Sequence, residues 1–174
     1  MKHYFKVYKT LLKLNFSLIT AYRVGFVSNI FSTCFWGIFQ IVWVLLLIGR
    51  IDSFHGWSKD ELIFLVANSV FIIIGLFHLF FSRNFDRFST VIDRGELDLI
   101  LVKPMDSQFL LSFWIVSFAH FFRFFIGAPI IAYLIIKIGI TISLINLVSY
   151  LTLVGFSLIL MYSIWLSFST LMIW

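Results

Sequence analysis

The stretch VGFVSNIFSTCFWGIFQIVWVLLLIG, residues 24–49, decides the fold of this chain, because it contains no charged residue. A helix needs about 20 predominantly apolar residues to cross the hydrocarbon core of a bilayer. The stretch is too long for the apolar core of a secretory signal peptide, and the basic region before it is also too long. We therefore predict a first membrane-spanning helix that is retained in the mature protein.

The rest of the chain has the same character. Residues 62–82 form a second uncharged segment, and we predict further spans at about 119–138 and 144–166. Hydrophobic residues make up 61% of the chain and charged residues 12%, whereas soluble domains are about half apolar and a quarter charged. A soluble core of this size cannot bury so much apolar surface. The prediction is an all-α, polytopic transmembrane helical bundle that forms one domain over residues 1–174.

The third span allows two interpretations, because residues 109–137 contain one interior charge, Arg123. In the first, a single long span carries a buried arginine, which is costly in a membrane. In the second, an interfacial lead-in helix runs to about Ala119 and a span follows. Arg123 and Lys137 then reach opposite membrane surfaces. We favour the second interpretation because it keeps both charges away from the bilayer centre.

Residues 139–174 are uncharged, too long for one span and too short for two spans with a loop. The chain ends in apolar residues without a polar tail. We therefore expect it to be truncated at its C-terminus.

The N-terminal residues 1–23 are basic and amphipathic. Their first four lysines are spaced by four, three and four residues, so they fall within roughly a 60° arc of one helical face, and tyrosines and leucines cover much of the other side. We predict a helix in the headgroup layer with its lysines toward anionic lipid, the alternative being a simple polar tail. The membrane-surface residues are Lys2, Lys6, Lys9 and Lys13.

Basic residues also predict the orientation. Lysines and arginines are concentrated in residues 1–23 and 83–108 and are fewer in residues 50–61, where Ser58 and Glu61 have the spacing of a capping box. By the positive-inside rule, the N-terminus and residues 83–108 face the cytoplasm, and residues 50–61 and the turn at Lys137 face outward. Since the basic residues flank apolar runs, the net charge of +5 indicates orientation and not nucleic-acid binding.

The sequence carries no recognisable catalytic centre. It has no phosphate-binding G-x-x-x-x-G-K-[ST] motif, no H-E-x-x-H motif and no cysteine–histidine cluster. The single cysteine, Cys34, excludes an internal disulfide framework. We expect no cofactor and no metal. The four histidines are scattered along different segments: His3, His55, His78 and His120.

Polar residues at membrane depth are few, and no acidic residue lies within a predicted span, which argues against a proton- or sodium-driven transporter. Each polar residue could line a substrate path or bond a neighbouring helix, and we favour helix bonding. These residues are Asn29, Gln40, Asn68 and Asn146.

Residues 83–108, RNFDRFSTVIDRGELDLILVKPMDSQ, are the one extended charged segment after the N-terminus. Apolar residues at helical spacing predict an amphipathic helix that ends at Gly95. Both signs of charge beside an apolar face suit docking onto another protein. From these residues alone, an ordinary solvated connector remains the equal alternative.

The part of this segment that reads RGELDLILVKPMD, residues 94–106, resembles the signature of a bacterial ABC-2 permease group. In that group a Gly-Glu-Leu-Asp stretch precedes an apolar pair and Lys-Pro. The Tyr22-Arg23 pair and the Gly56-Trp57-Ser58 turn are also similar to the group. The resemblance extends over essentially the whole chain.

The resemblance implies a six-span permease in the bacterial inner membrane, without an ATPase site of its own. Such a permease works in efflux with a second permease subunit and two copies of a separate ATPase. Only four spans fit this sequence, in keeping with the expected truncation. The family's loop between spans two and three couples to the ATPase, and this role falls here on Arg94, Gly95, Glu96, Leu97, Asp98, Lys103 and Pro104.

Two other classes compete with the permease. A membrane-embedded enzyme would need His, Asp or Glu residues clustered at one depth, and we find no such pattern. A non-transporting membrane anchor or assembly protein remains the alternative. A neighbouring gene for an ATPase would favour the exporter.

Overall fold

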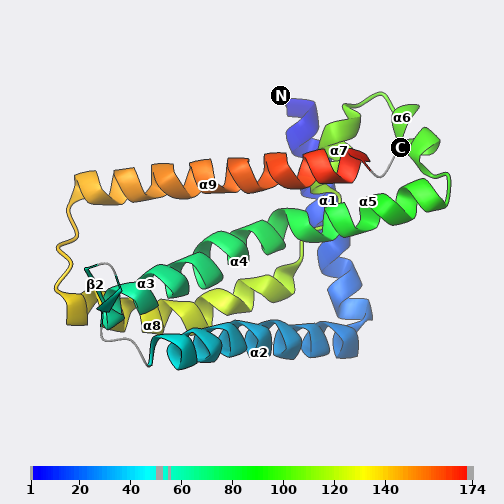
Figure 1. The fold of residues 1–174 in the computed structure, drawn as a ribbon. Helices are drawn as coiled ribbons and strands as arrows, with labels where there is room; N and C mark the ends of the chain where they lie inside the picture. The colour runs from blue at the N-terminus through cyan, green and yellow to red at the C-terminus, as the bar shows by residue number, and fades with distance from the viewer. Residues whose placement is uncertain (1, 50–52, 55, 172–174) are drawn as a thin grey trace.

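The computed structural model describes residues 2–49, 53–54 and 56–171, and nearly all of them are helical (Figure 1). This confirms the predicted all-α class. The α-helices are α1 (Lys2–Ala21), α2 (Arg23–Ile48), α3 (Lys59–Asn68), α4 (Ile74–Phe77), α5 (Arg83–Asp93), α6 (Leu97–Leu101), α7 (Ser107–Phe113), α8 (Phe122–Ile138) and α9 (Leu144–Leu171). Two π-helical segments (Ser69–Ile73 and His78–Ser82), a 3-10 turn (Phe118–Phe121) and a short hairpin of β1 (Ser53–Phe54) and β2 (Trp57–Ser58) complete the described elements.

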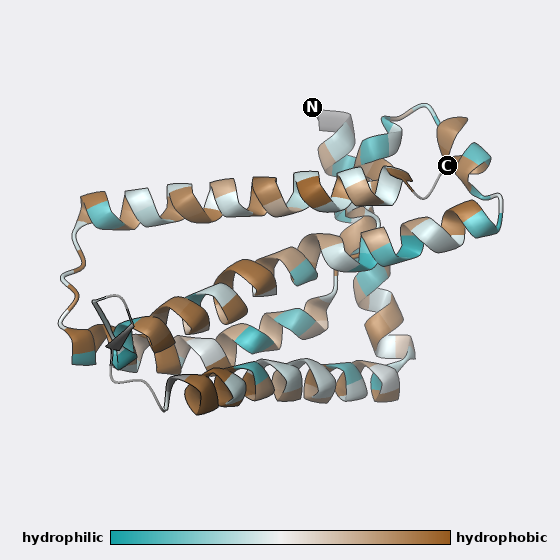
Figure 2. Cartoon of the chain, in the orientation of Figure 1, coloured by the Kyte–Doolittle hydropathy of each residue, from teal (hydrophilic) through white to brown (hydrophobic). Residues whose placement is uncertain are grey.

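Four helical segments are long and apolar enough to cross a membrane: Arg23–Leu47, Lys59–Asp93, Phe118–Ile138 and Leu144–Leu171. Figure 2 shows apolar residues along α2, α4, α8 and α9, with polar residues gathered on α1 and α5. The second segment is one continuous helical run of 35 residues. The amphipathic helix predicted after span two is therefore a direct extension of that span.

The connections lie at two opposite ends of the bundle (Figure 1). At one end, which we call the α1 end, α1 lies across the ends of the spans, and α5, α6, α7 and the end of α9 gather there. At the other, the hairpin end, Lys137 Nζ lies 2.7 Å from Asp60 Oδ1. The segments expected on each side of the membrane are thus grouped as alternating spans require, and the side that faces the cytoplasm stays a prediction.

Helix termini follow local sequence signals. The predicted capping box is formed, because the Ser58 side chain accepts from the Glu61 backbone N–H and the Glu61 carboxylate accepts from the Ser58 N–H at 2.7 Å. Gly139 ends α8 in a left-handed conformation with φ of 77°. Glycine adopts this conformation without steric cost, which explains the helix end there.

The central packing joins the second and third spans. Ala67, Val70, Phe71 and Leu134 form a buried apolar cluster. A Cβ atom at Gly127 would lie only 2.4 Å from the Phe71 Cβ. The third span can approach the π-helical segment this closely only because that position has no side chain.

The favoured lead-in helix and separate span are both found, but the position predicted for the Arg123 side chain is wrong. The side chain does not extend outward but is buried against α2, with 2% of the residue exposed. Its Nη2 donates to Gln40 Oε1 at 3.3 Å. A Cβ atom at Gly37 would lie 3.5 Å from the Arg123 Nε, so the missing side chain on α2 leaves room for the guanidinium group.

The lead-in helix before span three is shorter than predicted. It ends at Phe113, not near Ala119, and the backbone is non-helical from Ile115 to Ser117. Helical structure resumes at Phe118. The last span is longer than predicted, since α9 runs without interruption from Leu144 to Leu171.

Candidate functional site

The segment after α5 begins with a sharp turn that its sequence specifies. The Gly95 N–H donates to the Ile92 carbonyl at 2.9 Å, and the Glu96 N–H donates to the Val91 carbonyl at 2.9 Å. Together with the φ of 67° at Gly95, these bonds form a Schellman motif. The predicted stop at Gly95 is thus confirmed, and the chain turns into α6 with both carbonyls satisfied.

A small apolar core holds α5, α6 and α7 together. It consists of Val91, Ile100 and Leu110, which are 2%, 5% and 3% exposed, one from each helix. Leu97 and Met105 pack against it. The turn, α6 and the start of α7 therefore form one packed unit, which we call the turn unit (residues 91–110).

Two cationic side chains, one of them in the turn unit, contact the ring of Trp114. The Arg87 guanidinium carbon lies 4.8 Å from the centroid of the Trp114 ring, and the Lys103 ammonium nitrogen lies 4.7 Å from it. Cation–π contacts at partly exposed sites contribute on the order of 0.5–1 kcal/mol each. Lys103 thus holds the loop between α6 and α7 to the chain beyond α7.

The predicted coupling residues share one surface but not one environment. Arg94, Gly95, Asp98, Lys103 and Pro104 are exposed, whereas Glu96 and Leu97 are half-buried. None of the charged members has an ion-pair partner among the described residues. Between them, apolar side chains face outward: Leu99, Leu101 and Val102 are 69%, 58% and 84% exposed. Exposed apolar residues inside a rim of both charges have the composition of a protein-docking surface.

The non-helical break after α7 is held by an asparagine that the sequence interpretation did not single out. Asn84 Nδ2 donates to the Ile115 carbonyl at 2.8 Å, and the Ile115 N–H donates to Asn84 Oδ1 at 2.7 Å. Asn84 is only 2% exposed. An amide side chain at this position therefore replaces the hydrogen bonds that a helix would have supplied to Ile115.

Two further bonds hold the break. Asn15 Nδ2 donates to the Trp114 carbonyl at 2.9 Å, and the Ser117 N–H donates to the Leu79 carbonyl at 2.9 Å. The first ties the break to α1 and the second to the π-helical segment His78–Ser82. Irregular backbone is tolerated at membrane depth only when the protein satisfies its polar groups, and these contacts do so.

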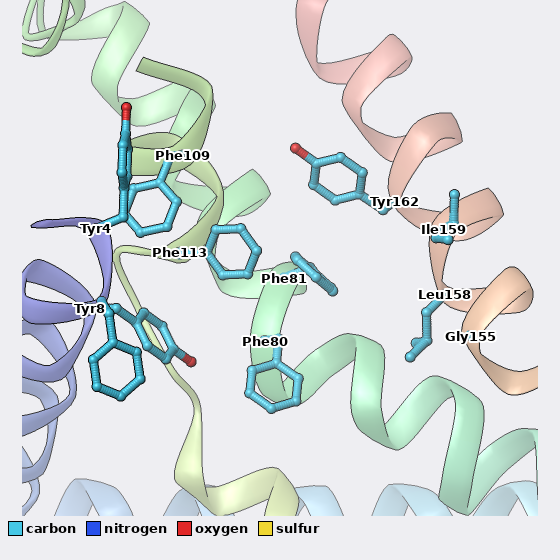
Figure 3. A pocket seen from close by; sticks show the side chains of 11 residues that line it. Tyr4, Tyr8, Phe80, Phe81, Phe109, Phe113, Gly155, Leu158, Ile159 and Tyr162 are labelled. Atoms are coloured by element: carbon cyan, nitrogen blue, oxygen red, sulfur yellow. The ribbon is translucent and has the colours of Figure 1, made fainter. Parts of the chain in front are cut away.

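An aromatic cavity of about 1010 Å³ lies beside the turn unit, between α1, α7, α9 and the second π-helical segment (Figure 3). Figure 3 shows aromatic rings from these elements around it, among them Tyr8, Phe113, Phe81 and Tyr162. Tyr162 on its α9 side bonds Gln108 Nε2 at 2.9 Å and Ser112 Oγ at 2.8 Å. An apolar cavity with few polar groups suits an apolar or amphipathic molecule. The lining residues include Tyr4, Tyr8, Phe81, Phe109, Phe113, Gly155 and Ile159.

The lysines of α1 lie on its outward face. Lys6, Lys9 and Lys13 are exposed, whereas Leu11 and Asn15 are buried against the bundle. The side chain of Lys2, the fourth predicted membrane-surface residue, lies outside the described part of the chain. Tyr8, on the same helix, lines the aromatic cavity, and its burial there raises the pKa of its hydroxyl above the ordinary value.

The four amide side chains predicted at membrane depth make different contacts. Gln40 binds Arg123, and Asn68 Oδ1 accepts from the Tyr150 hydroxyl at 2.5 Å, which joins the second and fourth spans. Helix bonding is confirmed for these two. Asn146 instead bonds the Thr141 carbonyl within its own turn, at 3.3 Å. Asn29 lines a cleft described below.

The histidines are not all scattered. His78 and His120 stack with ring centroids 5.2 Å apart. Their Nδ1 atoms contact the Ile74 carbonyl and the Ser117 hydroxyl, at 2.8 and 2.9 Å. Within the part of the chain that the structure describes, no group of three His, Cys, Asp or Glu side chains is arranged to hold a metal ion.

Comparison with protein families identifies one match. The family model described as ABC-2 family transporter protein matches residues 14–174. No curated protein and no solved structure matches the chain.

Proposed function

The chain belongs to the ABC-2 transporter family, and from this membership we propose that it is the permease subunit of an ATP-driven exporter. Its four apolar helical segments make it a multi-pass membrane protein. In the proposed assembly, ATP binds to a separate ATPase subunit, and a second permease subunit completes the path. We propose that the assembly lies in a bacterial inner membrane with the N-terminus of this chain in the cytoplasm.

The observation that carries the proposal is the unpaired, mixed surface of the turn unit. The exposed charged residues Arg94, Asp98 and Lys103 alternate along the chain with the exposed apolar side chains of Leu99 and Val102. A solvated connector would have no reason to keep an internal core beneath such a surface. We propose that the ATPase docks here, through Arg94, Gly95, Glu96, Leu97, Asp98, Lys103 and Pro104.

The turn unit is connected stiffly to two spans. α5 continues the second span without interruption, and Asn84 fixes the start of the third span through Ile115. Closure of the ATPase dimer on ATP binding would push on the turn unit and tilt both spans together. Such a transition needs packed elements with two discrete arrangements. The two π-helical segments of the second span are places where a helix commonly changes shape at functional sites.

The aromatic cavity supports an apolar or amphipathic cargo. It is lined by Tyr8 of α1 and Phe113 of α7 and reaches Gly155 of α9. No atom lies within 4 Å of a Cβ atom at Gly155, so there is room for a side chain to start there and Gly155→Leu should occupy part of the cavity. We expect Gly155→Leu to lower transport of a hydrophobic cargo while ATPase association is unchanged.

Co-purification with the ATPase encoded beside this chain tests the docking surface. Asp98→Lys and the double change Glu96→Lys with Asp98→Lys should weaken the association. Asp60→Lys, at the hairpin end, is the matched charge reversal and should leave it intact. Unchanged association in the double variant would remove the docking role and favour a non-transporting membrane anchor.

Thiol labelling in intact cells tests the orientation. In a Cys34→Ser background, Lys103→Cys should react only after the membrane is permeabilised, and Ile140→Cys should react from outside. The opposite pattern would place the turn unit away from ATP and exclude the coupling proposal.

A further inference from the structure

A second cavity, a partly polar cleft of about 440 Å³, lies at the α1 end. It is bounded by the C-terminal half of α1, the start of α2, Arg83 and residues 115–119. Its polar lining residues are Asn15, Tyr22, Asn29, Arg83 and Ser117, and none of the described residues that line it is acidic.

Three donor groups in this cleft have no hydrogen-bond partner among the described residues. They are the guanidinium of Arg83, the amide of Asn29 and the hydroxyl of Tyr22. Asp86, one helical turn from Arg83, does not pair with it. The amide nitrogen of Asn15 is already used, because it donates to the Leu11 and Trp114 carbonyls.

The cleft carries positive charge without a matching carboxylate among the described residues. Arg83 is exposed there, and the residues that line the cleft include no Asp or Glu. An anion bound beside Arg83 would balance its charge and accept its hydrogen bonds.

The position of the cleft identifies the source of such an anion. α1 lies across the ends of the spans (Figure 1). The C-terminal half of α1 lines the cleft. For a bundle embedded in a bilayer, this is the level of the lipid headgroups. Arginine is well suited to phosphate there, because its planar fork can donate two parallel hydrogen bonds.

We propose that this cleft binds the phosphate of an anionic phospholipid headgroup, with Arg83 as the charged ligand and Asn29 as a neutral donor. The cleft is roomier than a bare phosphate needs, which suits a headgroup whose acyl chains remain in the bilayer. The site requires that the chain is embedded in a membrane, but it is independent of ATPase docking.

Native mass spectrometry of the detergent-solubilised chain tests the site with three probes: phosphatidylglycerol, phosphatidylcholine and inorganic phosphate. We expect the wild-type chain to retain phosphatidylglycerol preferentially. Arg83→Gln removes a charge-assisted hydrogen bond and should weaken this binding by about tenfold or more, while Arg83→Lys should weaken it less.

An occlusion variant tests the place of binding without changing charge. Gly25 lines the cleft, and a Cβ atom there would meet no atom within 4 Å. Gly25→Leu should therefore occupy part of the cleft and lower phosphatidylglycerol retention, with thermal stability maintained. Gly155→Leu, which lies in the aromatic cavity, should leave the retention unchanged.

The charge control is Lys9→Gln, which removes one positive charge from the exposed face of α1. If Lys9→Gln weakens phosphatidylglycerol binding as much as Arg83→Gln does, general surface attraction explains the binding and the proposed site is wrong. If inorganic phosphate displaces the lipid and is lost in Arg83→Gln, the cleft belongs to a free phosphate compound and the lipid assignment is overturned. Equal retention of phosphatidylcholine would also overturn it.

Discussion

Removing the side-chain amide of Asn84 should destabilise this protein more than most single substitutions. In Asn84→Leu, the Ile115 N–H and carbonyl both lose the partners that now lie at 2.7 and 2.8 Å. A buried polar group left without a hydrogen bond costs about 1–3 kcal/mol, so two such groups cost about 2–6 kcal/mol. Leucine has the same number of side-chain heavy atoms as asparagine and the same branching, with bulkier ends, so the substitution leaves no cavity and the loss does not come from one.

Cys34, the single cysteine of the sequence, supplies the assay. A thiol-reactive dye follows its exposure while the detergent-solubilised protein is heated. For a chain of 150–250 residues, 1 kcal/mol shifts the melting temperature by about 2–4 °C, which gives an expected decrease of roughly 5–20 °C. The break at Ile115–Ser117 should also become more accessible to hydrogen exchange before the rest of the chain unfolds.

Asn146→Leu is the matched control. Asn146 is exposed, and its side-chain amide donates to the nearby Thr141 carbonyl at 3.3 Å, with no other partner among the described residues. Surface substitutions of this kind usually change stability by less than about 0.5 kcal/mol. If Asn84→Leu melts within about 2 °C of the wild type, as the control should, then the hydrogen bonds of Asn84 do not stabilise the break at Ile115.

Two further expectations concern stability, and the first uses the same melting assay. Gly127→Ala places a Cβ atom 2.4 Å from the Phe71 Cβ and should destabilise the protein by about 1–3 kcal/mol. Gly155→Ala, with no atom within 4 Å, should be neutral or stabilising by up to about 1 kcal/mol, and equal effects of the two changes would contradict the packing. Tyr150→Phe removes the hydroxyl that donates to Asn68 at 2.5 Å and should cost about 0.6–1.7 kcal/mol. Unfolding at increasing denaturant measures that cost, and no change would show that the bond contributes nothing.

Local signals in the sequence predicted the helix ends well. Gly95 ends α5 because a left-handed residue is needed there, and Ser58 with Glu61 forms the cap of α3 because their spacing suits reciprocal bonds. Each of these interactions involves residues within a few positions of one another. Such interactions depend little on how the helices pack.

The break before the third span could not be predicted in the same way. Ile115 binds Asn84, 31 residues earlier, and Trp114 binds Asn15, 99 residues earlier. Nothing in the sequence of residues 109–119 indicates that distant amides will satisfy the backbone there. The position of the Arg123 side chain was predicted wrongly for the same reason, because its partner Gln40 lies 83 residues away on another helix.

The sequence by itself determined the membrane class and the approximate positions of the spans, because the hydrocarbon core requires long helices without charge whatever their neighbours are. The family was also recognisable from residues 94–106, and the match over residues 14–174 confirms it. Only the tertiary structure decided where Arg123 lies, which amides join helices, and that Arg83 and Asn29 share a cleft. Those features depend on side chains meeting within a few ångströms across helices, and spacing along a single chain does not record which helices become neighbours.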